Sequence, residues 1–213
     1  MAANLADFVI AQPGGELLVY NRTASKAAEF AAARLAGVTA AATTSELAAR
    51  CSVTFCCLVN DSALKTVFSD FLQGPPNAGA VFVDCSTVLP STTAKLAAQA
   101  ADRGIAYCTC PIFGRPDAAA AGSLMAALAG ATAEVRGRLR PLVAAFAKNK
   151  VWDLGNDAAA ANAFKLTGNM YIVSQIELAA ECLTLGEAVG GGAAACMMGM
   201  GGDKRWQCAR RKG

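Results

Sequence analysis

The chain has 213 residues, of which 54% are hydrophobic and 16% charged, so we expect a globular protein with one well-packed core and not a disordered chain. Its formal net charge is +3, but five of the 19 basic residues lie in the last ten positions, which leaves 14 basic against 16 acidic residues before them and argues against nucleic-acid binding. There is no histidine, which excludes histidine-based catalytic triads and histidine metal ligands.

The predicted elements alternate between helices and strands. A helix over residues 1–11 ends at the breaker cluster Pro13-Gly14-Gly15. Apolar runs then predict strands, and capped or alanine-rich segments predict helices, in this order: strand 17–20, helix 25–35, strand 38–40, helix to residue 50 capped by Thr43 or Thr44, strand 52–59, helix 62–72 capped by Asp61, strand 80–84, helix 91–103, strands 105–109 and 124–128, helix 134–147 and strand 151–154. This alternation predicts an α/β fold with a parallel sheet covered on both faces.

One long helix is predicted over residues 156–187, which contain no proline and are apolar on most helical faces, so we expect burial along much of its length. It contains Lys165 between Phe164 and Leu166, and Asn169 follows on the same side of the helix. Two interpretations stay open from the helix alone. The lysine could have a lowered pKa and transfer protons, or its stem could lie along the core while its ammonium reaches water, which is the commoner case.

Polar clusters follow three of the predicted strands: Asn21-Arg22-Thr23, Asn60-Asp61 and Ser86-Thr87. The carboxyl ends of parallel strands meet at one edge of a sheet, where ligands bind. Turn chemistry alone could explain any one cluster. Three clusters at one edge, together with a lysine on a later helix, favour a ligand site.

Nine cysteines without a framework spacing predict free thiols in a reducing compartment, and we expect the cytoplasm. The spacing Cys108-Thr109-Cys110 is not that of a zinc site, so no metal is predicted. The first residues lack the basic region of a signal peptide, and no uncharged apolar run is long enough to span a bilayer, so no membrane partner is expected.

Four stretches, at residues 1–5, 19–23, 84–90 and 165–169, follow one another in an order and spacing that carry a resemblance. Together they resemble the β-hydroxyacid dehydrogenases, the group that contains 3-hydroxyisobutyrate dehydrogenase and is related to the NADP-binding domain of 6-phosphogluconate dehydrogenase. The stretches correspond to the family's first helix, its second strand and ribose-binding turn, its substrate-binding motif and its catalytic K-x-x-x-N helix motif. The resemblance covers residues 1 to 190 and implies a Rossmann-like, doubly wound, mostly parallel sheet followed by a long helix of an all-α domain.

The resemblance implies roles in substrate binding and catalysis. Lys165 would be the general acid/base for the substrate hydroxyl, and Asn169 would orient the substrate or the lysine. Ser86 would bind the substrate carboxylate, with Thr87 beside it and Gly114 in the substrate loop. The implied partner is a small-molecule substrate.

The resemblance also implies a nicotinamide cofactor. This cofactor would be held by Asn21, Arg22, Thr23, Leu58 and Val59, with Thr87 on the nicotinamide side. A guanidinium after the second strand can form a bidentate hydrogen bond with a 2′-phosphate, whereas a carboxylate there would accept a hydrogen bond from a 2′-hydroxyl. Arg22 therefore favours NADP(H) over NAD(H), and Lys26 could add charge there.

The sequence departs from the family in two functional loops. The substrate loop reads Pro111-Ile112-Phe113-Gly114-Arg115 where the family has P-V-S-G-G, which favours a bulkier or less polar substrate, or an acid met by Arg115. The family's first strand and its G-x-G-x-x-G loop do not appear. We therefore expect the strands at 17–20 and 52–59 to face a gap, with unpaired edges and exposed apolar surface.

The predicted organisation is a dinucleotide-binding domain over residues 1–155, a long interdomain helix over 156–190 and a disordered, glycine-rich and then basic tail over 191–213. The tail could be a nucleic-acid or targeting segment, but its composition favours an accidental extension such as a translated intron. The predicted function is an NADP-dependent oxidoreductase. The alternative is a truncated, inactive family member that acts as a binding module or through a homodimer.

Overall fold

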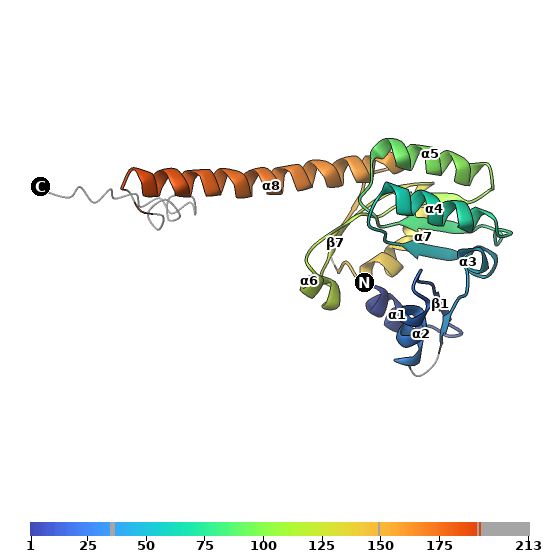
Figure 1. Cartoon of the computed structure of the whole chain (residues 1–213). Helices are drawn as coiled ribbons and strands as arrows, with labels where there is room; N and C mark the ends of the chain where they lie inside the picture. The colour runs from blue at the N-terminus through green and yellow to red at the C-terminus, as the bar shows by residue number, and fades with distance from the viewer. Residues whose placement is uncertain (35–36, 149, 191, 193–213) are drawn as a thin grey trace, which may run out of the picture. The chain divides into compact units, whose positions relative to one another are not determined.

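The computed structural model describes residues 1–34, 37–148, 150–190 and 192. The chain forms two compact units, Met1–Leu166 and Thr167–Gly213. The first unit contains all the strands among the described residues, and α8 begins in it (Figure 1).

The elements confirm the predicted alternation of helices and strands. They are α1 (Ala2–Ile10), β1 (Leu17–Val19), α2 (Ala24–Ala32), β2 (Val38–Ala40), α3 (Thr44–Arg50), β3 (Val53–Cys56), α4 (Asp61–Leu72), β4 (Val81–Asp84), α5 (Pro90–Ala101), β5 (Ala106–Thr109), β6 (Ile112–Phe113), α6 (Pro116–Ala120), β7 (Met125–Gly130), α7 (Ala133–Ala144), β8 (Val151–Asp153) and α8 (Ala158–Ala188). The short strand β6 lies in the predicted substrate loop, residues 111–115, and the short helix α6 follows this loop.

The strands form two separate sheets. In the larger sheet the order is β3-β4-β5-β7-β6, and β8 also pairs with β7, at residues 126–128. The pairs β3–β4, β4–β5 and β7–β8 are parallel, whereas β7 runs antiparallel to both β5 and β6. The mostly parallel sheet is therefore confirmed, with β7 and β8 running opposite to the other strands.

The smaller sheet contains only β1 and β2, which pair in parallel. Among the described strands, neither β1 nor β2 pairs with β3. The gap that the sequence analysis expected between residues 17–20 and 52–59 is thus present.

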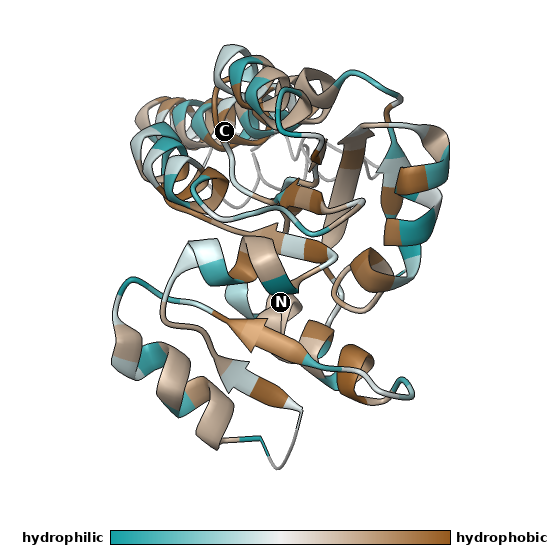
Figure 2. Cartoon of the chain, turned by 90° about the vertical axis from the view of Figure 1, so that its right-hand side faces the viewer, coloured by the Kyte–Doolittle hydropathy of each residue, from teal (hydrophilic) through white to brown (hydrophobic). Residues whose placement is uncertain are grey.

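Hydrophobic residues concentrate in the strands and build a core on each face of the larger sheet (Figure 2). Successive side chains of a strand point to opposite faces, and β4 shows the consequence: Phe82 belongs to one cluster, and its neighbours Val81 and Val83 belong to the other. All four residues of β4 are buried, as expected for a strand with neighbours on both edges and helices on both faces.

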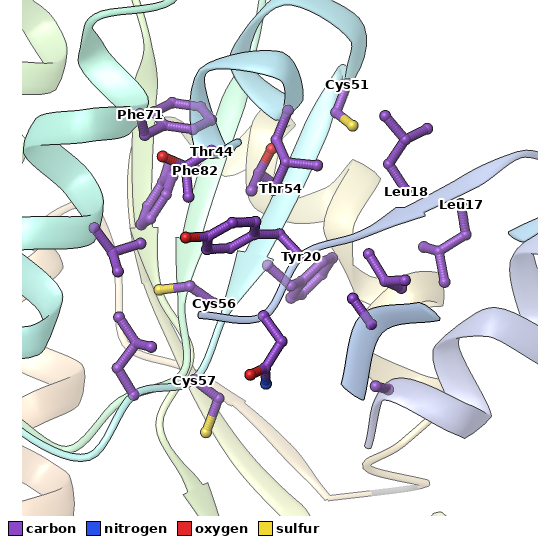
Figure 3. A pocket seen from close by; sticks show the side chains of 18 of the residues that line it. Leu17, Leu18, Tyr20, Thr44, Cys51, Thr54, Cys56, Cys57, Phe71 and Phe82 are labelled. Carbon is purple, nitrogen blue, oxygen red and sulfur yellow. The ribbon is translucent and has the colours of Figure 1, made fainter. Parts of the chain in front are cut away.

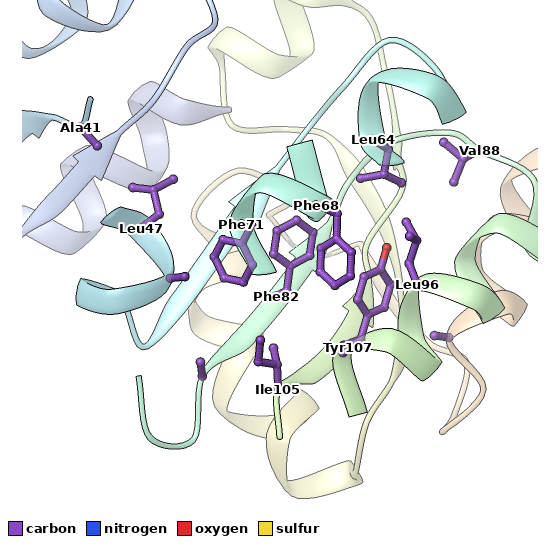
Figure 4. Close-up of a cluster of buried hydrophobic side chains, with 14 residues drawn as sticks. Ala41, Leu47, Leu64, Phe68, Phe71, Phe82, Val88, Leu96, Ile105 and Tyr107 are labelled. Carbon is purple, nitrogen blue, oxygen red and sulfur yellow. The ribbon is translucent and has the colours of Figure 1, made fainter. Parts of the chain in front are cut away.

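Aromatic rings dominate the core on the α4 and α5 side (Figure 4). Phe68 lies 4.8 Å from Phe82 and 5.5 Å from Tyr107 between ring centroids, both edge to face. Phe71 meets Phe82 at 5.0 Å. These contacts fix α4 against β4 and β5, and so fix the ends of those strands relative to each other.

The helix caps are partly as predicted. The Thr43 side chain accepts a hydrogen bond from the Glu46 N–H at 3.1 Å, which confirms one of the two predicted caps of α3. The prediction that Asp61 caps α4 is wrong. The side chain of Asn60 accepts the N–H of Ala63, so Asp61 is the first helical residue, and its carboxylate instead accepts the N–H of Leu89.

The long helix is confirmed as α8, but the expected burial along much of its length is wrong. Its first turns are buried at Ala158, Ala161, Asn162 and Lys165. Further along, large apolar side chains are 49% to 72% exposed, namely Met170, Tyr171, Ile172, Val173, Ile176, Leu178 and Leu185. A helix that is apolar all round is buried only where other elements surround it, and in the second unit no further helix or strand is described.

The predicted disordered tail, residues 191–213, lies outside the described residues except for Gly192. Among the described residues, no helix combines the length and the hydropathy needed to cross a membrane.

Candidate functional site

A large cavity of about 1110 Å³ lies in the first unit between β1 and β3 (Figure 3). The residues that follow the carboxyl ends of these two strands line it, as do both strands and the start of α1. Five predicted cofactor residues are among them: Asn21, Arg22, Thr23, Leu58 and Val59. The fold thus gathers residues from two distant parts of the sequence around one cavity.

The turn after β1 presents a cation to this cavity. The Asn21 side chain accepts the N–H of Thr23 at 2.9 Å, which closes an Asx turn and leaves Arg22 exposed at its tip. Arg22 forms no ion pair with any described residue, and neither does Lys26, which lines the same cavity one helical turn later. Two unpaired cations at the rim suit an anionic group.

The ends of β3 and β4 are joined by a hydrogen bond. The N–H of Leu58 donates to the Ser86 hydroxyl oxygen at 2.9 Å, and the N–H of Ser86 donates to the Asp84 carboxylate at 2.8 Å. Ser86 is 1% exposed, whereas the adjacent Thr87 is exposed. Burial raises the pKa of the Asp84 carboxyl, although its hydrogen bonds with Ser86, Cys56 and Tyr107 act to lower it.

Lys165 lies against an aromatic ring in the first unit. Its Nζ is 3.8 Å from the centroid of Phe113, the last residue of β6, and the residue as a whole is only 8% exposed. Burial lowers the pKa of the ammonium below its ordinary value. The geometry therefore favours the interpretation in which apolar surroundings lower the pKa of this lysine.

The residue after Phe113 is also constrained. Gly114 has φ of +141°, and a β-carbon added there would lie 2.6 Å from the Leu124 side chain. Only glycine fits this position without displacing Leu124, so the loop keeps its path beside the Phe113 ring.

Asn162 is a residue that the sequence analysis missed. It is fully buried one helical turn before Lys165, accepts the N–H of Val88 at 3.4 Å and donates to the Thr93 hydroxyl at 3.0 Å. Val88 lies two residues after Ser86, so this side chain ties the start of α8 to the Ser86 turn. A polar residue among alanines on the buried face of a helix was the available signal.

An aromatic cluster next to Lys165 was also missed. The rings of Phe113, Trp152 and Phe164 lie 5.4 to 6.1 Å apart between centroids, and they come from β6, β8 and α8.

Asn169, the second residue of the predicted K-x-x-x-N motif, lies four positions after Lys165 in the same helix and belongs to the second unit.

Sequence comparison now identifies the family. Residues 1–155 match the family described as the NAD binding domain of 6-phosphogluconate dehydrogenase. The chain belongs to this family. The resemblance to hydroxyacid dehydrogenases is confirmed, and the family binds a nicotinamide cofactor.

The curated relatives are longer than this member of the family. The chain is 32% identical to an uncharacterized oxidoreductase, YfjR, of Bacillus subtilis (strain 168), over 85% of this chain and 62% of that protein. It is also 32% identical to the 2-(hydroxymethyl)glutarate dehydrogenase of Eubacterium barkeri, over 76% of this chain and 54% of that protein. The chain therefore spans little more than half the length of these relatives.

Solved structures agree on the fold. The 3-hydroxyisobutyrate dehydrogenase of Mycobacterium tuberculosis, solved with L-serine, matches with a TM-score of 0.81 at 24% identity, over 94% of this chain and 66% of that one. At this identity the likeness concerns the fold, and it confirms the Rossmann-like architecture followed by a helix.

Proposed function

We propose that this chain is the cofactor-binding part of an NADP-dependent oxidoreductase of the β-hydroxyacid dehydrogenase type. Its reaction would be hydride transfer between NADP(H) and a small hydroxy acid or a related carbonyl compound. The proposal rests mainly on Arg22, in the turn after β1. Its exposed guanidinium lies at the rim of the cavity and forms no ion pair with a described residue.

The lining of the cavity fits such a cofactor in three respects. Arg22 and Lys26 offer positive charge for a 2′-phosphate, because a guanidinium binds phosphate oxygens through a fork of donors. Met1 and Ala2 at the start of α1 line the cavity, and the first turn of a helix has free N–H groups that suit a phosphate. Leu58 and the 85% exposed Val59 offer apolar surface for the nicotinamide side, and Thr87 follows Ser86, whose hydroxyl accepts the Leu58 N–H.

In this proposal Lys165 holds and moves the proton of the substrate hydroxyl. When bound, the cofactor supplies the hydride chemistry, and one base near the hydroxyl is then required for the accompanying proton. A lysine whose pKa is lowered by burial is closer to the operating pH than an exposed lysine, so it exchanges a proton more readily in both directions.

The remaining substrate residues are proposed from the family resemblance. Ser86 already accepts one hydrogen bond from the Leu58 N–H, and its own O–H would donate to the substrate carboxylate. Thr87 and Gly114 would border the substrate, and Asn169 would orient it or Lys165. The buried Phe113 ring beside Lys165 supports a less polar substrate than the serine of the family loop would select.

A fluorescence titration of the chain with NADPH and with NADH tests the cofactor assignment. We expect micromolar binding of NADPH and weaker binding of NADH. Arg22→Ala should weaken NADPH binding by about 10- to 100-fold, because a charged hydrogen bond contributes about 1.5–3 kcal/mol, and should change NADH binding little. Arg138→Ala, an exposed cation on α7 outside the cavity, is the matched control. Equal losses for both cofactors in Arg22→Ala would refute the assignment to NADP.

A second function has a specific observation in its favour. Because β1 and β3 belong to different sheets, the cofactor residues at their ends are not held by one continuous ladder of backbone hydrogen bonds. The chain could then bind cofactor weakly and act as a binding or dimerisation module. Absence of NADPH binding would favour this alternative, together with a molecular mass that rises to twice the monomer mass as the protein concentration increases.

The seven described cysteines are free, which supports the proposal that the chain works in a reducing compartment, the cytoplasm.

A further inference from the structure

A fully buried acid stands directly before the Ser86 turn. Asp84, the last residue of β4, has an exposed fraction of 0%. None of the ion pairs among the described residues includes it, so no described cation lies within ion-pair distance of its carboxylate. An ionised carboxylate without a counter-charge is costly to bury. An acid at such a position therefore needs a role, and its contacts indicate one.

Three segments direct hydrogen-bond donors at this carboxylate. One oxygen, Oδ1, accepts the Ser86 backbone N–H at 2.8 Å and the Cys56 thiol at 3.4 Å. The other, Oδ2, accepts the Tyr107 hydroxyl at 3.5 Å. The Ser86 hydroxyl is a further partner, since a hydrogen bond between the two side chains acts to lower the pKa of Asp84. The donors thus come from β3, from β5 and from the turn after β4.

Asp84 is the member of this network whose charge changes most readily toward neutral pH. Burial raises the pKa of its carboxyl above the ordinary value of 3.8. Burial also raises the pKa of the Cys56 thiol well above its ordinary range, and it raises the pKa values of the Tyr107 hydroxyl and the nearby Cys57 thiol. These three groups keep their protons at neutral pH, so a change of charge in the network belongs to Asp84.

The charged groups of the covering helices are directed elsewhere. Helices α4 and α5 cover the face on which Asp84 lies, because side chains alternate along β4 and Phe82 belongs to the aromatic core on that side (Figure 4). Three of the charged residues of these helices are exposed, namely Lys65, Asp70 and Lys95. The fourth, Asp61, accepts the N–H at the cap of α5, and the ammonium of Lys165 in α8 lies over an aromatic ring of β6.

The Ser86 hydroxyl can point in two directions. Its oxygen already accepts the Leu58 N–H at 2.9 Å, which leaves one lone pair and the hydroxyl hydrogen. An ionised carboxylate only accepts, so beside it the hydroxyl donates to Asp84. A protonated carboxyl group can donate, so beside it the Ser86 oxygen accepts and the hydroxyl hydrogen points elsewhere.

We propose that Asp84 is a positioning residue whose protonation state sets the direction of the Ser86 hydroxyl. With the carboxylate ionised, Asp84 holds this hydroxyl. With the carboxyl group protonated, the hydroxyl is free to donate to the carboxylate of a substrate, a step that rests on the proposed function of Ser86. Two carboxylates repel each other at one hydroxyl, so each hydroxy acid bound as an anion would be accompanied by one proton, taken from solvent by Asp84.

Backbone amide shifts of the full chain test the role of Asp84 without ligand or cofactor. The N–H of Ser86 reports on the carboxylate directly, and the N–H of Leu58 reports on the hydroxyl. In an NMR titration we expect both shifts to change with one midpoint, above the ordinary carboxyl pKa of 3.8. Asp84→Asn should abolish both changes. Ser86→Ala should abolish the change at Leu58 alone, because the N–H at position 86 still meets the carboxylate.

Two results would overturn this role. One is a Leu58 amide whose shift does not change through the Ser86 midpoint, and the other is a Leu58 change that persists in Ser86→Ala, which would assign it to the backbone. Asp70→Asn, at an exposed acid of α4, is the matched control and should leave the midpoint unaltered. If Asp84→Asn does not fold, the wild type and Ser86→Ala decide.

Calorimetry with 3-hydroxypropionate tests the consequence for binding. Above the carboxyl pKa of this ligand, its affinity should fall by up to about tenfold per unit of pH beyond the midpoint, the limit for uptake of one proton. Titrations in buffers of different protonation enthalpy should show this uptake. In Asp84→Asn the affinity should be independent of pH, and the uncharged 3-hydroxypropionamide should bind the wild type without proton uptake.

Two outcomes of the calorimetry would refute the coupling of a proton to the anion. They are binding of 3-hydroxypropionate without proton uptake, and a pH dependence that persists in Asp84→Asn, which would belong to Lys165. No binding at all would refute the proposed substrate class, whereas the Leu58 titration would still decide the role of Asp84.

Discussion

The side-chain oxygen of Asn162 accepts a hydrogen bond from the backbone N–H of Val88, although 74 residues separate the two in the sequence. The amide of Asn162 also donates to Thr93. Through these bonds a buried side chain at the start of α8 holds both the turn after β4 and the first part of α5. Lys165 follows one helical turn later, so its position relative to that turn depends on Asn162.

Asn162→Ala should lower the free energy of unfolding by about 1–3 kcal/mol, because it leaves the buried N–H of Val88 and the hydroxyl of Thr93 without their partner. Urea denaturation measures the change. Gln99→Ala, at an exposed position of α5, is the control and should have little effect. In combination with Thr93→Val the losses should not add, because the two side chains share one hydrogen bond. Strict additivity would contradict the role given to Asn162.

Lys165 should make the stability of the chain depend on pH in a defined direction. Burial lowers its pKa in the folded chain below the ordinary value of 10.5, so the unfolded chain binds more protons between the two values. The charged lysine therefore opposes folding at neutral pH, and this effect disappears as the pH rises through the folded pKa toward 10.5. Lys165→Met should be the more stable protein at neutral pH, with a difference that shrinks at alkaline pH. A difference that is constant with pH would show that Lys165 titrates normally.

The Phe113 ring should favour the charged form of Lys165. An ammonium over an aromatic face gains about 0.5–2 kcal/mol, so Phe113→Leu should lower the pKa of Lys165 further. An NMR titration of the lysine side-chain resonances measures it. Trp152→Leu alters the same aromatic cluster without removing the ring under Nζ, and should shift the pKa less. Equal shifts in both variants would assign the effect to burial alone.

Arg136 should be essential to the join between β7, β8 and α8. Arg136 is 5% exposed, and its guanidinium donates to the carbonyls of Gly130 and Ala131 and to the side chains of Asp153 and Asn156, the last two at 2.7 Å each. Arg136→Ala should therefore destabilise the chain by about 2–4 kcal/mol, since hydrogen bonds to charged groups contribute more than neutral ones.

Arg136→Lys is the matched variant, because it keeps the charge but lacks the planar fork of donors. Its loss in a thermal or urea denaturation should lie between the wild type and Arg136→Ala. A lysine variant as stable as the wild type would mean that charge alone, and not the fork, makes the contact.

The sequence by itself determined the alternation of strands and helices, a cap of α3 at Thr43 or Thr44, and the extent of the long helix, and with the family resemblance it predicted the gap between β1 and β3. The first three features depend on local periodicity and on cap chemistry within a few residues, whereas the gap was expected because the first strand of the resembled family does not appear. The grouping of Asn21, Arg22 and Thr23 with Leu58 and Val59 around one cavity was expected from the family resemblance.

Only the tertiary structure decided the rest. The reversal of β7, the contact of Lys165 with Phe113, and the bonds of Asn162 all join segments that are distant in the sequence, and no local pattern encodes such pairs. The cap of α4 moved to Asn60 because the Asp61 carboxylate is used by Leu89, another distant residue. The exposure of α8 beyond its first turns also depends on tertiary structure. The apolar composition of a helix predicts burial, but the helix is buried only where other elements pack against it.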